Sequence, residues 1–251
     1  MWPFWKKITN EEKSGFKSII CIPGYWKDTV EIFGKTDGRF MVVGDIIMDL
    51  INKVHYNIEL CAKDERMRKS FEVAGKVTGV TNEFLGKIEK HTSVIYVTGS
   101  TGNFNDARLF AGVASLIAET GGIGVKVETT GKAFEKDKWA AFASDGQDAD
   151  MYELFVVDSL LQEDGTTFSC GMHNVGLSDT IISNLQFKDA QRVVRIFNYY
   201  QVIDKPVLKV NDGFQTDINS PFYKITEELN QPYKGNEQFG NPFGMWRLTK
   251  E

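Results

Sequence analysis

Apolar positions recur with helical spacing most clearly in the middle of the chain. Five apolar side chains share one helical face: Leu109, Phe110, Val113, Leu116 and Ile117. This spacing predicts an amphipathic helix over residues 105–120. Asn103 or Asn105 can cap its first turn, and Gly121-Gly122 can end it.

Strict alternation at residues 54–60 predicts a half-buried strand, with Val54, Tyr56 and Ile58 on one face and His55 and Asn57 on the other. Other apolar, β-rich runs predict strands at residues 17–22, 39–43, 93–97, 124–128, 151–161, 166–172, 206–210 and 244–248. Further helices are expected at residues 64–77, 82–90, 132–142 and 189–200.

This order of elements predicts the fold class. From residue 93 to residue 206 it runs strand, helix, strand, helix, strand, strand, helix, which fits ferredoxin-like elements. We expect an α+β protein with mixed or antiparallel sheets packed with helices, and the first ninety residues could supply a duplicate of the same kind. Residues 1–251 should form a single compact unit, with a subdivision into 1–91 and 92–251 as the alternative.

Charge and cysteine content narrow the functional classes. The formal net charge of the 251 residues is −5, and basic residues form only short clusters, so nucleic-acid binding is disfavoured. No run of 18 apolar residues occurs, so we expect no stable membrane insertion. The three cysteines, Cys21, Cys61 and Cys170, are far apart, as in a protein of the reducing cytoplasm.

The first residues are aromatic and then basic, with Trp2, Phe4 and Trp5 before Lys6-Lys7. We expect these rings to pack on the domain, because aromatic burial stabilises strongly. A small membrane-surface or partner anchor is the alternative.

A glycine-rich loop between a predicted strand and a helix is the strongest candidate for cofactor binding. Gly99, Ser100, Thr101 and Gly102 lie where a dinucleotide-binding loop belongs, and Glu128 ends the next strand, where an acidic side chain could hold a ribose. The third glycine of the pattern is replaced by Asn105, and no tyrosine has a lysine four residues later. A capped strand-to-helix turn is therefore the favoured interpretation, and we expect no cofactor.

The remaining polar patterns are weaker. Cys170 and His173 have the spacing of half a metal site, but no second close pair exists, so a buried cysteine and a hydrogen-bonded histidine are expected, with no metal. The acidic residues 145–150 do not follow the spacing of a calcium loop. His91 could stabilise a helix end or belong to a site.

Aromatic residues in the turn-rich segment 239–246 are the candidates for partner binding. Phe239, Phe243 and Trp246 could form a contact surface or cover a sheet edge.

Several stretches in order resemble the bacterial family known as domain of unknown function 4261. They are residues 20–26, 90–94, 106–109, 121–125, 171–179 and 245–248. The resemblance covers most of the chain and implies a bacterial α+β protein. It implies no established activity, cofactor or catalytic residue.

No catalytic set is visible, so we expect a non-enzymatic, cytoplasmic protein-binding module, such as an immunity protein that neutralises a secreted toxin. The acidic charge could steer it to a basic partner protein. One alternative is a nucleotide- or dinucleotide-binding enzyme that uses residues 98–105, and another is a structural or regulatory subunit. The sequence leaves the oligomeric state open.

Overall fold

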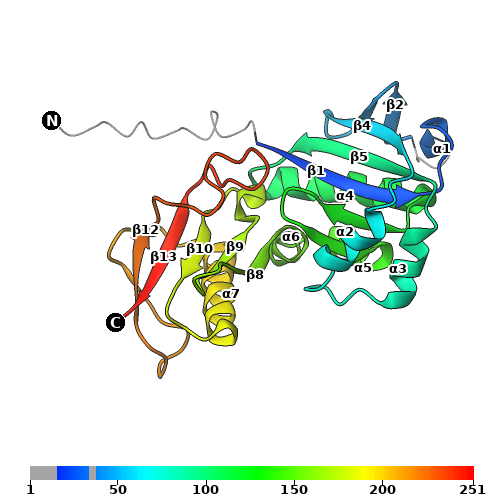
Figure 1. Cartoon of the computed structure of the whole chain (residues 1–251). Helices are drawn as coiled ribbons and strands as arrows, with labels where there is room; N and C mark the ends of the chain where they lie inside the picture. The colour runs from blue at the N-terminus through cyan, green and yellow to red at the C-terminus, as the bar shows by residue number, and fades with distance from the viewer. Residues whose placement is uncertain (1–15, 34–37) are drawn as a thin grey trace.

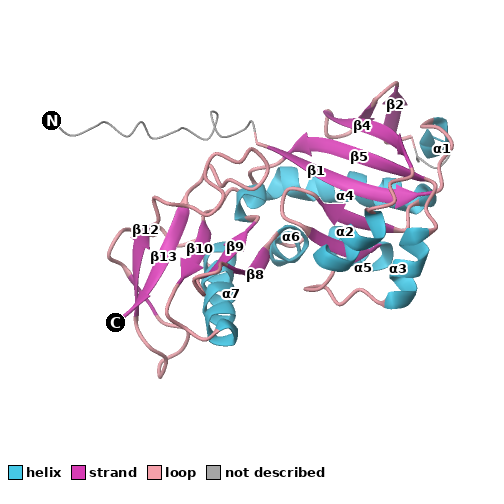
Figure 2. Cartoon of the chain, viewed as in Figure 1, coloured by secondary structure: helices cyan, strands magenta, loops and turns pink. Residues whose placement is uncertain are grey.

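A computed structural model describes residues 16–33 and 38–251 of the chain. These residues form two β-sheets with helices packed against and between them, as Figure 1 and Figure 2 show. The strand pairs are antiparallel with one exception, so the predicted α+β class is confirmed. The aromatic residues Trp2, Phe4 and Trp5 lie outside the described residues.

The first sheet, sheet A, is wholly antiparallel. Its strand order is β2 (Phe40–Val43), β3 (Ile46–Asp49), β4 (Val54–Ala62), β5 (Ser93–Ser100), β1 (Lys17–Gly24), β6 (Gly124–Val127) and β7 (Lys132–Glu135). The order β4-β5-β1-β6 is that of a split βαβ unit. Because β5 lies between β4 and β1, sheet A includes residues from both sides of position 91.

Helices cover both faces of the central strands of sheet A, so these strands are apolar on both sides. Ile20 and Ile22 of β1 face α4 (Phe104–Gly121), α5 (Lys136–Asp145) and α6 (Asp148–Phe155). Cys21 faces the opposite way, toward α2 (Met67–Ala74) and α3 (Asn82–Glu89). The short α1 (Val30–Phe33) adds Ile32 to the first cluster. The burial of each large apolar side chain stabilises the folded chain by about 1.5–3 kcal/mol.

Helix α4 has nearly the bounds predicted from its periodicity. Its N-cap is Asn103, whose side-chain oxygen accepts a hydrogen bond of 2.9 Å from the backbone N–H of Asp106. The alternation predicted for β4 is also confirmed, since Tyr56 and Ile58 are buried while His55 and Asn57 are exposed.

The second sheet, sheet B, has the order β11 (Gly213–Phe214), β12 (Tyr223–Glu227), β13 (Met245–Lys250), β10 (Asp179–Ile182), β9 (Thr167–Cys170) and β8 (Val157–Leu161). β10 and β13 form its parallel pair. Helix α7 (Phe187–Ile203) packs Val194 and Phe197 against one face of this sheet. A 3-10 turn, η1 (Met172–Val175), follows β9.

Three predicted elements are wrong. Residues 151–161 form the end of α6 and then β8 rather than one strand. Met151, Tyr152, Leu154 and Phe155 are all buried, and a short apolar run of this kind cannot be assigned to a helix or a buried strand by periodicity alone.

Residues 132–142 are strand β7 followed by α5, because Lys132 to Glu135 pair with β6 before the helix begins. Residues 206–210 join no sheet. Pro206 has no N–H to donate, and the nearest strand along the chain, β11, begins only at Gly213.

The two sheets meet at a small apolar cluster. Tyr152 and Val156, at the end of α6, pack against Met172 of η1 and Val202 of α7. Within the described ranges, no helix combines the length and apolar character needed to cross a bilayer.

Candidate functional site

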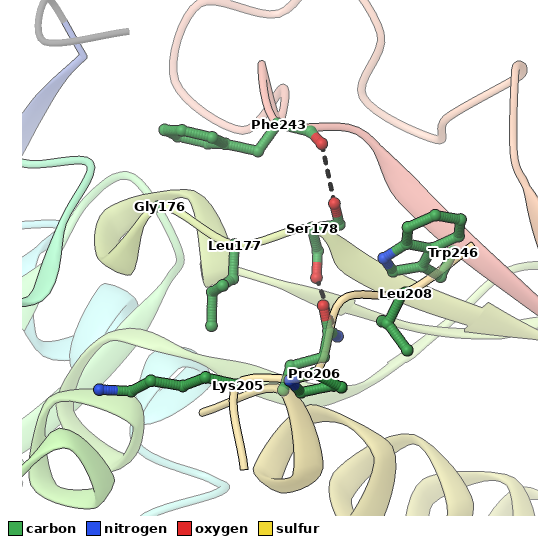
Figure 3. Close-up of a pocket in the computed structure, with 9 residues that line it drawn as sticks. Gly176, Leu177, Ser178, Lys205, Pro206, Leu208, Phe243 and Trp246 are labelled. Atoms are coloured by element: carbon green, nitrogen blue, oxygen red, sulfur yellow. Dashed lines mark hydrogen bonds between the residues drawn. The ribbon is translucent and has the colours of Figure 1, made fainter. Parts of the chain in front are cut away.

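A pocket of about 240 Å³ opens where the end of α7 approaches the start of β13. Its walls come from three segments: the turn after η1, the chain that leaves α7, and the chain that enters β13. Figure 3 shows the lining residues, which are Gly176, Leu177, Ser178, Gln201, Lys205, Pro206, Leu208, Phe243 and Trp246. We call this the β13 pocket.

Residues with positive φ turn the backbone around the β13 pocket. Gly176 has a φ of 80°, and a Cβ there would lie 2.3 Å from the carbonyl oxygen of Gly102, so no other residue fits. Gly244 has a φ of 95°, and Lys205 reaches 49° just beyond the end of α7. The bend at Lys205 turns the chain so that Pro206 and Leu208 line the pocket.

Most polar groups of the β13 pocket already have partners inside the chain. The hydroxyl of Ser178 donates to the carbonyl oxygen of Phe243 at 2.8 Å. The side-chain amide of Gln201 donates to the carbonyl oxygen of Ser178 at 3.2 Å. The ammonium of Lys205 extends away from the pocket to Asp148, at 2.6 Å. The surface left for a ligand therefore combines apolar and aromatic side chains with polar atoms that mostly have partners already.

One hydrogen-bond donor of the β13 pocket is unused. The indole Nε1–H of Trp246 points toward the other lining residues in Figure 3 and forms no hydrogen bond with any residue that the structure describes. An indole nitrogen can only donate. The pocket therefore offers apolar and aromatic side chains together with one donor suited to a carbonyl oxygen.

The chain beside the pocket is open to solvent and belongs to neither sheet. Val207 is 85% exposed, and its apolar neighbours Ile203 and Val210 are 55% and 48% exposed. The backbone N–H groups of Val207 and Leu208 have no hydrogen-bond partner among residues 16–33 and 38–251. Unpaired backbone N–H groups of this kind are available to pair with an added strand.

The pocket brings together two of the three aromatic residues predicted to bind a partner. Phe243 and Trp246 line it. Phe239 does not: its ring centroid lies 5.2 Å from that of Tyr233, and its carbonyl oxygen accepts the thiol of Cys170 at 3.8 Å. No sequence pattern identifies Leu177, Pro206 and Leu208 as pocket residues, because their approach to Trp246 depends on tertiary structure.

The glycine loop predicted as a cofactor site is closely packed. A Cβ on Gly99 would lie 2.5 Å from the Tyr56 ring, and Ser100 is exposed. The backbone N–H groups of Thr101 and Gly102 donate to the carbonyl oxygens of Phe16 and Asn174, at 3.0 and 2.9 Å. A phosphate would have to displace these bonds to be held by the loop.

Glu128, the acidic residue proposed to accompany that loop, is engaged elsewhere. Its carboxylate lies 2.8 Å from the ammonium of Lys126, which also donates to Ser70 of α2. Glu128 therefore faces the side of sheet A covered by α2, whereas α4 begins on the opposite side.

Cys170 and His173 are both buried but form no site together. Burial raises the pKa of the Cys170 thiol well above its ordinary value. His173 was expected to be hydrogen-bonded, and this is wrong: within the described residues, neither ring nitrogen has a partner. The ring instead packs on Phe16, with centroids 4.4 Å apart, and its burial lowers the pKa of His173 to about 3.

His91 has a structural role. Its Nδ1 lies 2.6 Å from the carbonyl oxygen of Ile88, and its Nε2 accepts the backbone N–H of Asp64 at 3.1 Å. These bonds tie the end of α3 to the chain that enters α2. Residues 16–33 and 38–251 contain no group of three or more His, Cys, Asp or Glu side chains arranged to hold a metal ion.

A buried ionic network lies between the sheets, beside a smaller pocket of about 140 Å³. The ammonium of Lys132 donates to the carbonyl oxygen of Val156 at 2.7 Å and lies 4.0 Å from Glu153, and burial lowers the pKa of Lys132 to about 8. The guanidinium of Arg195 pairs with Asp158 at 3.1 Å and also with Glu153. Each charge faces an opposite one, so the network joins β7, α6, β8 and α7 rather than leaving a group free for a ligand.

No family model, curated protein or solved structure matches this chain. The resemblance to the family of domain of unknown function 4261 therefore stays a prediction.

Proposed function

We propose that this chain is a protein-binding module that takes an apolar side chain of its partner into the β13 pocket. The observation that carries the proposal is the combination of a small cavity with apolar and aromatic side chains in its walls, the unused donor of Trp246 and the unpaired backbone at Val207 and Leu208. An extended peptide could supply a side chain, a carbonyl oxygen and a strand edge in one segment.

The size of the pocket supports a peptide side chain over a small-molecule ligand. Small-molecule sites usually span about 300–1,000 Å³, and the β13 pocket measures about 240 Å³. Its polar groups are mostly satisfied within the chain, so it lacks the convergent polar set that orients a substrate. Buried aromatic residues at the centre of a contact are typical of protein interfaces.

The narrower prediction, an immunity protein that neutralises a secreted toxin, rests on the net charge of −5, which could attract a basic partner. A gene for a secreted toxin beside the gene for this chain would support it.

Selection from a displayed random-peptide library, followed by fluorescence anisotropy with the purified peptides, tests the binding proposal. We expect the selected peptides to share an apolar anchor. Trp246→Phe keeps an aromatic ring but removes the Nε1–H, so it should weaken binding about 5- to 10-fold, the effect of one hydrogen bond of about 1–1.5 kcal/mol.

Leu208→Asp should abolish binding because it places a charge in the apolar wall. Leu161→Asp is the matched control, since Leu161 is 56% exposed on β8 and lines none of the β13 pocket. Peptides that bind both pocket variants as tightly as the unmodified chain would refute the proposal, and so would a library that yields no binder.

A further inference from the structure

The smaller pocket, of about 140 Å³, has Lys132 in its wall, and we call it the Lys132 pocket. Its other walls come from α5, α6, α7 and β8. The charges of the buried ionic network beside it face one another, so they are not available to a charged ligand. Several hydrogen-bond donors of the pocket, by contrast, have no partner in the described part of the chain, and a neutral ligand can use them.

The ammonium of Lys132 is only partly satisfied. Its Nζ donates to the carbonyl oxygen of Val156 at 2.7 Å, whereas Oε2 of Glu153, at 4.0 Å, lies beyond hydrogen-bond distance. An ammonium has three N–H groups, and the other two have no hydrogen-bond partner among residues 16–33 and 38–251. Lys132 is only 6% exposed, and a charge buried so deeply is costly unless it is fully hydrogen-bonded. Burial accordingly lowers the pKa of Lys132 to about 8, which leaves part of the amine neutral near pH 7.

Two further donors of the Lys132 pocket are unused. Gln191 of α7 and Ser159 of β8 line the pocket, and neither the amide nor the hydroxyl forms a hydrogen bond with any residue that the structure describes. Ser159 lies where the pairing of β8 with β9 is irregular, and such a bulge re-aims side chains, often beside an active site. The pocket therefore combines an amine with two donors suited to a carbonyl oxygen.

We infer that Lys132 is a reactive amine that forms an imine with a small aldehyde or ketone bound in the Lys132 pocket. The neutral amine adds to the carbonyl carbon, the two protons of the nitrogen leave with the carbonyl oxygen as water, and a C=N bond remains. No other reactant is needed. Gln191 and Ser159 donate to the carbonyl oxygen and stabilise the negative charge that develops there as the amine adds. A lysine desolvated in a pocket is an effective nucleophile toward carbonyl compounds.

The size of the pocket limits the carbonyl compound. Small-molecule sites usually span about 300–1,000 Å³, so a pocket of about 140 Å³ suits a compound of only a few non-hydrogen atoms. The Lys132 pocket shares no lining residue with the β13 pocket, so this inference is independent of the proposed function.

Reductive trapping tests the inference. The full chain is incubated at pH 7 with millimolar propanal and sodium cyanoborohydride, which reduces an imine to a stable secondary amine, and the modified lysines are mapped by mass spectrometry. An ordinary lysine has a pKa of about 10.4, so at pH 7 the neutral fraction of Lys132 is about 200-fold larger. We expect Lys132 to be labelled at least about 10-fold faster than the exposed Lys136, which lies outside the pocket. A Lys132 that stays unlabelled, or that reacts no faster than Lys136, would overturn the inference.

Gln191→Leu tests the part played by the pocket. It should slow the labelling of Lys132 about 5- to 10-fold, the effect of one hydrogen bond, and it should leave the fold intact because the amide has no partner in the described chain. Gln162→Leu is the matched control: Gln162 is half-buried beyond the end of β8, its side chain bonds to no described residue, and it lines none of the pocket. Equal labelling of Lys132 in the two variants would refute the role of the pocket. In guanidinium chloride the preference for Lys132 should vanish, and a preference that survives unfolding would also overturn the inference.

Discussion

The buried, unpartnered ring of His173 should make stability fall in mild acid. His173 is fully buried, and its ring nitrogens bond to no described residue. Burial holds the pKa of His173 at about 3 in the folded chain, whereas an unperturbed histidine has a pKa of about 6.5. Between these values the unfolded chain binds a proton that the folded chain does not, so the free energy of unfolding decreases as the pH decreases.

The size of the effect follows from the two pKa values. Each pH unit below about 6.5 costs about 1.4 kcal/mol, so moving from pH 7.5 to pH 5.0 should cost about 2 kcal/mol. His173→Leu cannot bind a proton and should escape this loss. Near neutral pH the variant should be similar to the unmodified chain or more stable, because an unsatisfied buried polar group costs about 1–3 kcal/mol, while lost ring packing on Phe16 costs about 0.5–1.5 kcal/mol.

Urea unfolding followed by tryptophan fluorescence at pH 7.5 and pH 5.0 measures the effect. The quantity to compare is the difference in the free energy of unfolding between His173→Leu and the unmodified chain. The contributions of the other titrating groups are the same in both proteins and cancel in this difference. That difference should grow by about 2 kcal/mol in favour of the variant at pH 5.0. If it is the same at both pH values, the imidazole titrates normally in the folded chain and the reasoning is wrong.

Three further predictions concern other buried groups. Lys132→Met should lower the free energy of unfolding by about 1–3 kcal/mol in urea, because it leaves the carbonyl oxygen of Val156 without its donor and Glu153 with Arg195 as its remaining cation, whereas the exposed Lys138→Met should change it by less than about 1 kcal/mol. Burial raises the pKa of Asp179 to about 7, so the folded chain holds a proton that the unfolded chain lacks between about pH 4 and pH 7. Stability due to Asp179 should fall as the pH rises through this window, and Asp179→Asn should remove that slope in urea titrations. Gly171→Ala should prevent folding or lower the melting temperature sharply, because φ is 118° and the new Cβ would lie 2.1 Å from the carbonyl oxygen of Phe155.

Local patterns predicted those elements whose residues carry a single clear period. Helix α4 was found from its apolar stripe and its cap at Asn103, and β4 from its alternation. The prediction failed at residues 151–161, where four buried apolar side chains end α6 and the apolar strand β8 follows after one residue. The feature that marks this helix is its N-terminal cap: Asp150 accepts the backbone N–H of Gln147 at 2.9 Å in a capping box.

The β13 pocket could be predicted only in part. Phe243 and Trp246 were candidates because aromatic residues in a turn-rich segment often contact partners. Their neighbours Leu177 and Leu208 come from segments more than thirty residues away, and only the positions of β10 and α7 bring them together. The place of β2 at the edge of sheet A, among the strands that the structure describes, was likewise not visible, because strand order depends on pairing between segments far apart in the sequence.

The position of β13 has a consequence for how the chain folds. β13 is the last strand of sheet B along the chain, yet it lies between β10 and β12. Asp179 pairs with Met245, more than sixty residues later. During synthesis, one edge of β10 therefore stays unpaired until β13 has been made. Long-range pairing of this kind is slow, because the chain between the two strands must first close into a loop. Sheet B should thus form after sheet A. Until then the unpaired edge of β10 is prone to aggregation, and a chaperone would act there.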